Sequence, residues 1–437
     1  MREMRDSGVE WIGEIPKDWN CCKQKYRFTL INGRAFKDNE FEEDGTYRIL
    51  RVGNLFSNPV WYSSSLELEP DKYCEKGDLI YAWSMSYGPY IWNEEKVIYH
   101  YHIWKTKLVS DMDKMFSYYY LQALTESIKS QTHETTMGFV TMGIMNNSYI
   151  AYPRNIKEQK KISNYLDIKC SKIDEIIEKQ QAIIEKLKEY KLSTITEVVT
   201  SGLNQKREMK DSHVLSIGRI PTNWDVTKLK YLFGNGDDGL KIGPFGSAIK
   251  GKTLESGLYK IYNQAHLINN DFSLNRHYVS EDTFNDLKAY EVKPGDVLFS
   301  MMGTIGKCQI MPKGYPKGIM DSHLLKARLN EKVIPEFFIY AYDKDFSNQV
   351  IQQLLYTSNG TIMNGLNSTI LKNVYIALPP LEEQEEIVEF LNKFTKNIDD
   401  RIGVKTKIVE KLQEYKNPLS TRLSQEKRRC SSCQTLM

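Results

Sequence analysis

An internal duplication constrains the fold of this chain more than any other feature of its sequence. Asp6–Phe28 returns as Asp211–Phe233 with about half of the positions identical, and Glu185–Lys191 returns as Glu410–Lys416. Shorter matches follow in the same order between these segments. Repeats in register over such a length predict two tandem copies of one structural unit, each about 205 to 225 residues long.

Composition then limits the class of protein. The chain has 437 residues, a formal net charge of +3 and 26% charged residues, which is typical of a folded protein rather than a strongly basic one. No stretch approaches the ~18 apolar residues of a membrane-spanning helix, and the first residues lack the apolar segment of a signal peptide. Because the seven cysteines show no disulfide framework, we expect a cytoplasmic protein that does not cross a membrane.

Each copy divides into a strand-rich domain and a long helix. Short runs rich in Ile, Val, Tyr and Leu predict strands, as at Tyr47–Val52 and Asp296–Met301. After Pro153 and Pro380 the apolar period becomes that of a helix. The fold class is therefore expected to be α+β. Its predicted parts are a first domain at 1–153, a central helix region at 154–205, a second domain at 206–379, a C-terminal helix region at 380–425 and a disordered tail at 426–437.

Both predicted helices carry heptad-like apolar stripes, so we expect them to pair as an antiparallel coiled coil with pseudo-two-fold symmetry. The stripe of the first helix comprises Leu166, Ile173, Ile176, Ile183, Leu187 and Tyr190, widened by Ile177 and Ile184. The stripe of the second comprises Leu391, Phe394, Ile398, Ile408, Leu412 and Tyr415. Polar residues also fall at these heptad positions, where they could fix the register or face a second partner: Lys169, Gln180, Arg401 and Lys405.

Motifs of catalysis and of metal binding are weak or missing. Gly234–Gly239 matches GxGxxG, but Pro244 follows closely and the other copy lacks the pattern, which favours a loop over a nucleotide site. There is no Walker A lysine, no HExxH and no amino-methyltransferase signature. His102 and His323 match between the copies and suggest a structural role, while Cys430 and Cys433 form a single pair without the second pair of a zinc site. We expect no catalytic residue and no metal site.

Basic and amide side chains instead gather around predicted strands of both domains. Arg reads guanine and Asn or Gln reads adenine in the major groove, whereas Lys more often neutralises phosphate. The predicted DNA-binding residues of the first domain are Arg34, Lys37, Arg48, Arg51 and Asn54. Those of the second domain are Lys241, Ser247, Lys250, Lys252, Lys260, Asn263, Gln264 and His266.

Several motifs resemble the specificity subunits of type I restriction-modification enzymes. They are the SGxxWIGxIPxxW pattern at Ser7–Trp19, the segment Lys241–Ser247, the run Gly295–Phe299 followed by Gly303–Gly306, and Leu378–Gln384 before a long helix, echoed at Pro153–Gln159. The first copy departs from the pattern, because it lacks the Pro-Pro pair and has Ser84–Gly88 in place of Gly-Thr-Ile-Gly. The likeness covers nearly the whole chain.

The resemblance implies a non-catalytic DNA reader with two target recognition domains, each holding half of a bipartite, asymmetric site, separated by paired helices that act as a ruler. It also implies the partners: double-stranded DNA, two methyltransferase subunits and two restriction subunits. No cofactor is expected on this chain, since S-adenosylmethionine, ATP and magnesium would belong to the partner subunits. Two alternatives stay open from the residues alone: a coiled-coil scaffold without a DNA role, and a stand-alone DNA methyltransferase or nuclease.

Overall fold

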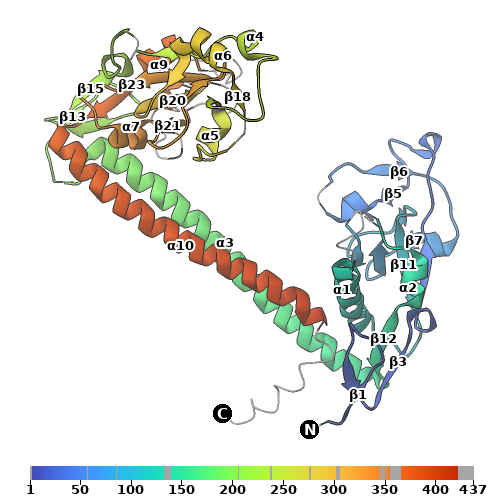
Figure 1. Ribbon diagram of the computed structural model, residues 1–437. Helices are drawn as coiled ribbons and strands as arrows, with labels where there is room; N and C mark the ends of the chain where they lie inside the picture. The colour runs from blue at the N-terminus through green and yellow to red at the C-terminus, as the bar shows by residue number, and fades with distance from the viewer. Residues whose placement is uncertain are drawn as a thin grey trace. The chain divides into compact units, whose positions relative to one another are not determined.

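The structure of the chain is a computed structural model (Figure 1) that divides into two compact units. One unit contains Met1–Gln181 and Thr406–Met437, and the other contains Ala182–Lys405. The described residues are 2–56, 58–84, 86–131, 139–204, 206–236, 239–274, 277–301, 306–343, 345, 350, 352–354 and 366–421. The predicted tail at 426–437, with Cys430 and Cys433, lies outside them, as do the first three residues of Gly303–Gly306.

The first domain contains two four-stranded sheets. One has the strand order β4 (Phe28–Asn32), β11 (Ile103–Leu108), β8 (Leu79–Ala82), β9 (Gly88–Ile91), and the other β6 (Tyr62–Ser64), β5 (Tyr47–Leu50), β10 (Val97–Tyr99), β7 (Tyr73–Cys74). A hairpin of β1 (Met4–Asp6) and β2 (Glu14–Pro16) and a pair of β3 (Trp19–Lys23) and β12 (Tyr149–Pro153) complete the strands. The helices are α1 (Lys114–Gln131) and α2 (Met142–Asn147). All four residues of β8 are buried, which explains why this strand reads as a continuous apolar run.

The second domain repeats this topology strand for strand. Its sheets have the orders β16 (Lys241–Ile242), β23 (Leu324–Arg328), β20 (Asp296–Ser300), β21 (Cys308–Ile310) and β18 (Tyr278–Val279), β17 (Tyr259–Tyr262), β22 (Gly318–Met320), β19 (Glu291–Val292). The hairpin recurs as β13 (Met209–Asp211) and β14 (Arg219–Pro221), and the strand pair as β15 (Asp225–Lys228) and β24 (Tyr375–Leu378). The helices are α4 (Gly246–Ile249), α5 (Gln264–Ile268), α6 (Glu281–Asp286), α7 (Pro335–Tyr342) and α9 (Ser368–Asn373). The predicted duplication is therefore confirmed at the level of strand order.

Each domain leads into a long helix, α3 (Ile156–Ser201) after the first and α10 (Leu381–Thr421) after the second. The Oδ1 atom of Asn155 accepts the Lys157 backbone N–H at 2.9 Å and caps the start of α3. Gly202, with φ of +74° in the left-handed region, follows the last residue of α3 and ends the helix. The long central and C-terminal helices expected from the sequence are therefore present.

A buried glutamine near the start of each helix ties it to the preceding domain. Gln159 donates from Nε2 to the carbonyls of Pro153 and Asp111, both at 2.9 Å, and accepts the Asp113 backbone N–H at 2.8 Å. Gln384 does the same in the second copy, with the Pro379 and Lys332 carbonyls and the Ile334 backbone N–H as its partners. These hydrogen bonds explain why the glutamine at the end of the motif recurs in both copies.

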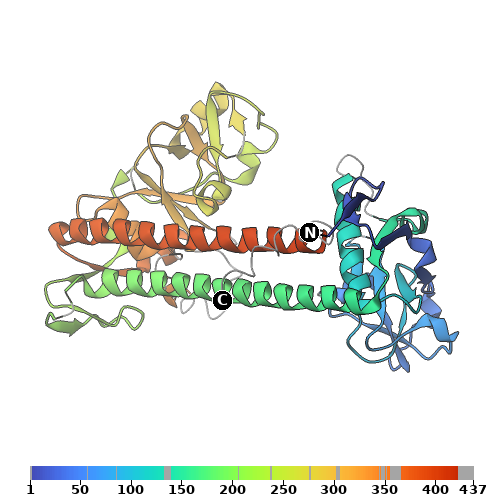
Figure 2. The same cartoon turned by 90° about the horizontal axis from the view of Figure 1, so that it is seen from below.

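The helices run antiparallel, as the ion pairs in each unit show (Figures 1 and 2). Lys416 pairs with Asp174 in one unit, at 2.6 Å, and Lys191 pairs with Asp399 in the other, at 2.7 Å. Each pair joins the lysine of one repeat to the aspartate of the other repeat, and the two repeats exchange roles. Both helices advance by the same 17 residues between the pairs (191 − 174 and 416 − 399), so the register is the same in both units.

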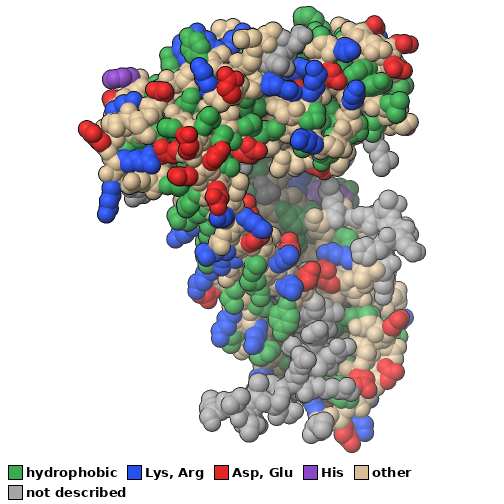
Figure 3. Space-filling view, turned by 60° about the vertical axis from the view of Figure 1, so that its left-hand side comes forward, with side chains coloured by type: hydrophobic (Ala, Val, Ile, Leu, Met, Phe, Trp, Pro, Cys, Tyr) green, Lys and Arg blue, Asp and Glu red, His purple; other side chains and the backbone are tan. Residues whose placement is uncertain are grey.

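The apolar stripes are wider than the buried seam, and part of the sequence prediction is wrong here. Ile173 and Ile177 are buried against Val409, as the heptad pattern predicts. Ile176 and Ile183, in contrast, are about two-fifths exposed, and Tyr190 is more than half exposed. Two paired helices bury only one narrow edge of each apolar stripe. The other edge of the stripe would need a third element to cover it. Hydrophobic side chains also stay exposed among charged ones on the face of the molecule shown in Figure 3.

Candidate nucleic-acid interface

One pair of parallel strands in each domain brings two loops side by side. β5 and β10 are parallel neighbours, so Arg51 and His100, which follow their carboxyl ends, lie at the same edge of the sheet. In the second domain β17 and β22 are parallel neighbours, which places Asn263 beside Asp321. All other strand pairs within the described sheets are antiparallel. The two copies therefore present an equivalent loop edge with different side chains.

In the first domain the guanidinium of Arg51 lies over the Tyr62 ring, 4.7 Å from its centroid. The residue is exposed, and among the described residues no carboxylate pairs with its side chain. The Asn54 side chain stabilises the loop conformation, because its Oδ1 accepts the Arg51 backbone N–H at 3.1 Å and its Nδ2 donates to the Val60 carbonyl at 2.9 Å. The guanidinium of Arg51 can therefore donate hydrogen bonds to a ligand, and Asn54 fixes the loop that carries it.

A cluster of rings lies beside Arg51, and the sequence singled out only one of its members, His102, for a structural role. The ring centroids of Trp83 and His102 lie 4.9 Å apart, those of Tyr101 and His102 4.0 Å apart, and those of His100 and His102 4.8 Å apart. Burial, followed by the charges of His102 and Arg51, lowers the pKa of His100 to about 4. Burial also lowers the pKa of His102. The signal that could have found the cluster is the run of alternating Tyr and His at Tyr99–His102.

The other basic residues predicted for this domain are largely engaged with acids. Arg34 pairs with Glu40 at 2.5 Å and lies over the Phe36 ring. Arg48 pairs with Glu94 at 2.9 Å and with Glu95 at 2.6 Å, and it lies over Trp61. Lys37 is exposed. Arg34 still borders the loop edge, because its backbone N–H donates to the Tyr99 carbonyl at 3.0 Å and its carbonyl accepts from Tyr101.

The equivalent edge of the second domain carries amides and a histidine. Asn263 caps helix α5, with its Oδ1 accepting the Ala265 backbone N–H at 3.1 Å. The half-buried Gln264 accepts from the Ser300 hydroxyl at 3.4 Å. His323 is about half exposed and lies 3.2 Å from the Asp321 carboxylate. Asn263 takes the place that Arg51 has in the first domain, since each is the residue directly after the first of the two parallel strands.

Four further predicted residues surround this edge at the surface. Lys241 lies on β16 with its ammonium 5.6 Å from the centroid of the Tyr290 ring. Ser247 is exposed on α4, and Lys250 and Lys252 are exposed just after it. A Cβ built on Gly246 would lie 3.7 Å from the Ser322 hydroxyl, so the start of α4 adjoins the loop that contains His323.

Lys260 and His266 are buried, which removes them from the predicted DNA-binding surface. Lys260 is 3% exposed and donates to the Phe272 carbonyl at 2.8 Å, and burial lowers its pKa. His266 is fully buried, with Nε2 2.8 Å from the Leu274 carbonyl. Both side chains hold the loop that follows β17 and have no surface with which to reach a duplex. Their position in β17 and α5, not their polarity, decides their role.

Features of other kinds of site are weak among the described residues. In the Gly234–Gly239 motif the Gly239 backbone N–H donates to the Gly236 carbonyl at 3.0 Å. No group of three or more His, Cys, Asp or Glu side chains in the described ranges could hold a metal ion. No helix in the described part of the chain is both long and apolar enough to span a membrane.

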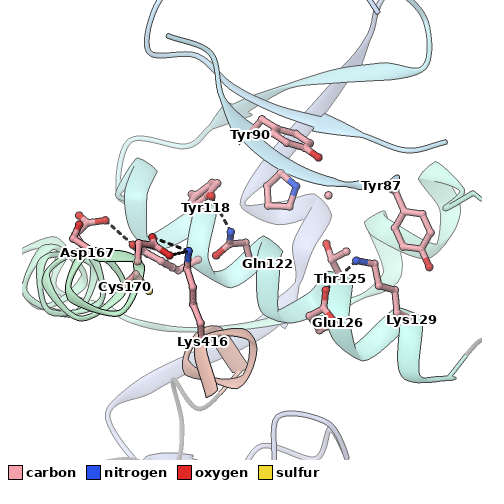
Figure 4. Close-up of a pocket in the computed structure, with 15 residues that line it drawn as sticks. Tyr87, Tyr90, Tyr118, Gln122, Thr125, Glu126, Lys129, Asp167, Cys170 and Lys416 are labelled. Carbon is pink, nitrogen blue, oxygen red and sulfur yellow. Dashed lines mark hydrogen bonds and ion pairs between the residues drawn. The ribbon is translucent and has the colours of Figure 1, made fainter. Parts of the chain in front are cut away.

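A pocket of about 380 Å³ lies in the unit that contains the first domain, between α1, β9, α3 and the end of α10 (Figure 4). Its polar groups pair with one another: Gln122 donates to the Tyr118 hydroxyl at 2.8 Å, and Lys129 pairs with Glu126 at 3.0 Å. The Tyr119 hydroxyl donates to Asp167 at 2.6 Å. Tyr340 makes the equivalent bond to Asn392 at 2.8 Å in the second copy, which makes these contacts a repeated attachment of domain to helix.

Two copies of an α+β domain, each followed by a long helix and each with a variable loop edge, define a protein with tandem recognition domains. The chain belongs to the type I restriction modification DNA specificity domain family, whose model matches residues 16–200 and 240–412. It is the specificity subunit of a type I restriction-modification system, and as such it recognises DNA and is not itself an enzyme. The sequence-based prediction of family and function is confirmed, and the scaffold and enzyme alternatives are not supported.

Curated relatives support this assignment, and a solved structure shares the fold. The chain is 23% identical to the type I restriction enzyme EcoBI specificity subunit of Escherichia coli, over 89% of this chain and 81% of that protein. It is 27% identical to the MjaVIII specificity subunit of Methanocaldococcus jannaschii, over 70% of this chain and 68% of that protein. A solved structure described as the basis of complex assembly and conformational transition of the type I R-M system shares the fold, with a TM-score of 0.67, 14% identity and coverage of 93% of this chain and 97% of that one.

Proposed function

We propose that the two loop edges read the two halves of a bipartite, asymmetric DNA target. In the first domain Arg51 donates to guanine, and the ring cluster at Trp83 and His102 lies beside it. In the second domain Gln264 and the neighbouring Asn263 read adenine, while Lys250 and Lys252 contact phosphates. The observation that carries this proposal is the equivalent placement of chemically different side chains after the parallel strand pairs of both copies.

The role of lysines and arginines follows from their partners. Arg34 and Arg48 already pair with acids, so in this proposal they hold the loop edge and approach the duplex from its border. In the same proposal Lys37 and Lys241 neutralise phosphates, and Ser247 donates a hydrogen bond to the DNA backbone. The chain has a net charge of only +3, and the affinity for DNA therefore depends on these local groups.

We also propose that two methyltransferase subunits dock on the paired helices. Three apolar residues recur on the exposed edge of both helices, at positions that match between the repeats. In α3 they are Tyr165, Ile183 and Tyr190, and in α10 they are Phe390, Ile408 and Tyr415, all more than one-third exposed. The spacings within each set are 18 and 7 residues, which are five and about two helical turns, so each set shares one face of its helix.

Two equivalent patches favour two copies of one partner, because each offers an aromatic residue, an isoleucine and a tyrosine at the same spacing. The patches differ in one neighbour. In one unit Phe394 stacks with Phe390, at 5.9 Å between ring centroids, and contacts Tyr190. In the other unit Lys169 takes the place of Phe394 and lies over Tyr165. Two restriction subunits would join this core, and S-adenosylmethionine, ATP and magnesium would enter with the partners, in the cytoplasm where DNA is accessible.

The test of this function is selection of bound DNA from a random duplex library by the full chain assembled with its methyltransferase subunits. The proposal expects two short conserved blocks separated by a spacer without sequence preference. Arg51→Ala is expected to relax one block only, and Lys250→Ala to weaken binding to all sequences alike. Selected DNA with a single block, or with no conserved block, would contradict the proposal. Exchange of the patch residue Tyr190→Asp should lower the number of methyltransferase subunits bound without changing the selected sequence.

A further inference from the structure

One large apolar side chain stands out at the loop edge of the second domain. Phe245 is 87% exposed and directly precedes α4, with Ser247 exposed on this helix and Lys250 exposed just after it. Single exposed apolar residues are common on protein surfaces and need no function by themselves. The position of Phe245, between polar groups proposed to contact bases and lysines proposed to contact phosphates, is what calls for an explanation.

The backbone around Phe245 is held firmly in place. The Gly243 backbone N–H donates to the Leu324 carbonyl at 2.9 Å, and a Cβ at Gly243 would lie 1.8 Å from the Asp321 carbonyl oxygen, so only glycine fits. Pro244, with its ring-fixed φ, follows and is buried. On the other side the Phe245 carbonyl accepts the Ala248 backbone N–H at 2.9 Å. The exposed ring therefore projects from a pre-organised turn, next to the loop of Asp321.

The first domain does not project an aromatic ring from the matching loop. Its loop also begins with a glycine that closely approaches the neighbouring loop, since a Cβ at Gly33 would lie 2.3 Å from the Tyr99 carbonyl oxygen. The aromatic residue of that loop, Phe36, packs instead against the cluster of Ile49, Tyr73 and Ile98 and lies beneath the Arg34 guanidinium, 5.3 Å from the ring centroid. In this loop the exposed aromatic ring is therefore found in the second domain, whereas the first domain exposes Phe56 in a different loop.

We infer that Phe245 is a specificity-determining residue that packs on the C5-methyl group of a thymine in the major groove. An aromatic ring beside amide readers is suited to this contact, because the major-groove edge of an A·T pair offers the adenine N6 and N7 to an amide and the thymine methyl to an apolar side chain. This inference rests on the proposed function. It adds that the half-site read by the second domain contains thymine and that Phe245 detects its methyl group.

The experiment uses the full chain assembled with its methyltransferase subunits and the duplex selected by it. The half-site of the second domain is the block that changes in Gln264→Ala. Each thymine of that block is replaced in turn by deoxyuridine, which removes only the methyl group. The assembly is expected to lose about four- to tenfold in affinity at one position, as the loss of one buried methyl group predicts. Phe245→Ala should bind about as weakly to thymine DNA and be indifferent to the replacement.

The control is Leu215→Ala, because Leu215 is equally exposed, at 87%, but lies between β13 and β14. It should keep the full response to deoxyuridine. A block without thymine, a wild-type assembly indifferent to deoxyuridine, or a Phe245→Ala chain whose only defect is loss of methyltransferase subunits would each overturn the inference while leaving the bipartite target in place. Loss of all sequence preference in the wild-type assembly would instead contradict the proposed function.

Discussion

Replacement of Gln384 by leucine should loosen the attachment of α10 to the second domain. The glutamine side chain is fully buried and makes three hydrogen bonds, to the Ile334 N–H and to the carbonyls of Lys332 and Pro379. A hydrogen bond contributes a net ~1 kcal/mol, and a buried group left without its partner costs ~1 to 3 kcal/mol. We therefore expect the free energy of local opening to fall by about 3 kcal/mol, which is about 100-fold in the opening equilibrium.

Amide hydrogen exchange followed by mass spectrometry measures this opening without assuming that the whole chain unfolds in one step. Peptides from the start of α10 and from α7 should exchange about 100-fold faster in Gln384→Leu. The matched control is Gln413→Leu, an exposed position of the same helix, which should exchange like the wild type. Gln159→Leu should produce the same acceleration around Asp113 and leave the other unit unchanged. A Gln384→Leu chain that exchanges within threefold of the Gln413→Leu control would refute the role assigned to this network.

Three further predictions concern the helices and the ring cluster. Asp174→Lys or Lys416→Asp alone should lower Tm slightly, since a partly exposed ion pair contributes ~0.2 to 1 kcal/mol. The double variant, which exchanges the two charges, should restore the wild-type Tm. A Tm of the double variant below that of either single variant would show that the pair does not form. Burial lowers the pKa of His100 to about 4, so between pH ~6.5 and 4 a proton binds His100 in the unfolded chain but not in the folded one. The stability of the first domain should therefore fall as the pH drops through this range. His100→Phe should make the Tm of the first domain depend less on pH over the same range. Seven residues inserted after both Lys179 and the facing Lys411 should lengthen the spacer of the DNA target by about three base pairs, as read from methylated sites; an active assembly with the old spacer would rule out a ruler.

The architecture could be predicted from the sequence because the residues repeated in both copies make the contacts that define the fold. Trp19 and Trp224 match between the copies since each indole N–H donates to a glutamate at the start of the following helix, Glu158 at 3.4 Å or Glu383 at 3.0 Å. The Lys-Asp pairs of the helices also connect matching positions. Contacts of this kind leave identical residues in both repeats, and they could be found by comparing the chain with itself.

The candidate site was less accessible from the sequence, because polarity does not reveal burial. Lys260 and Gln264 are both polar residues close to one strand end, yet the ammonium of Lys260 turns inward to a carbonyl. Ile176 and Ile173 occupy the same heptad stripe, yet only Ile173 is buried. The placement of Arg51 beside His100 depends on the parallel pairing of β5 with β10, a long-range contact that local residue patterns do not encode. Tertiary packing decides which of these side chains are buried and which are exposed.

The most direct measurement of the central claim is a map of methylated adenines in DNA from cells that produce the chain with its methyltransferase subunit. Three chains are compared: wild type, Arg51→Ala and Gln264→Ala. The account predicts a two-part motif for the wild type, a change in one part only for Arg51→Ala, and a change in the other part only for Gln264→Ala. A contiguous motif, or a single substitution that alters both parts, would contradict two independent recognition domains in one chain.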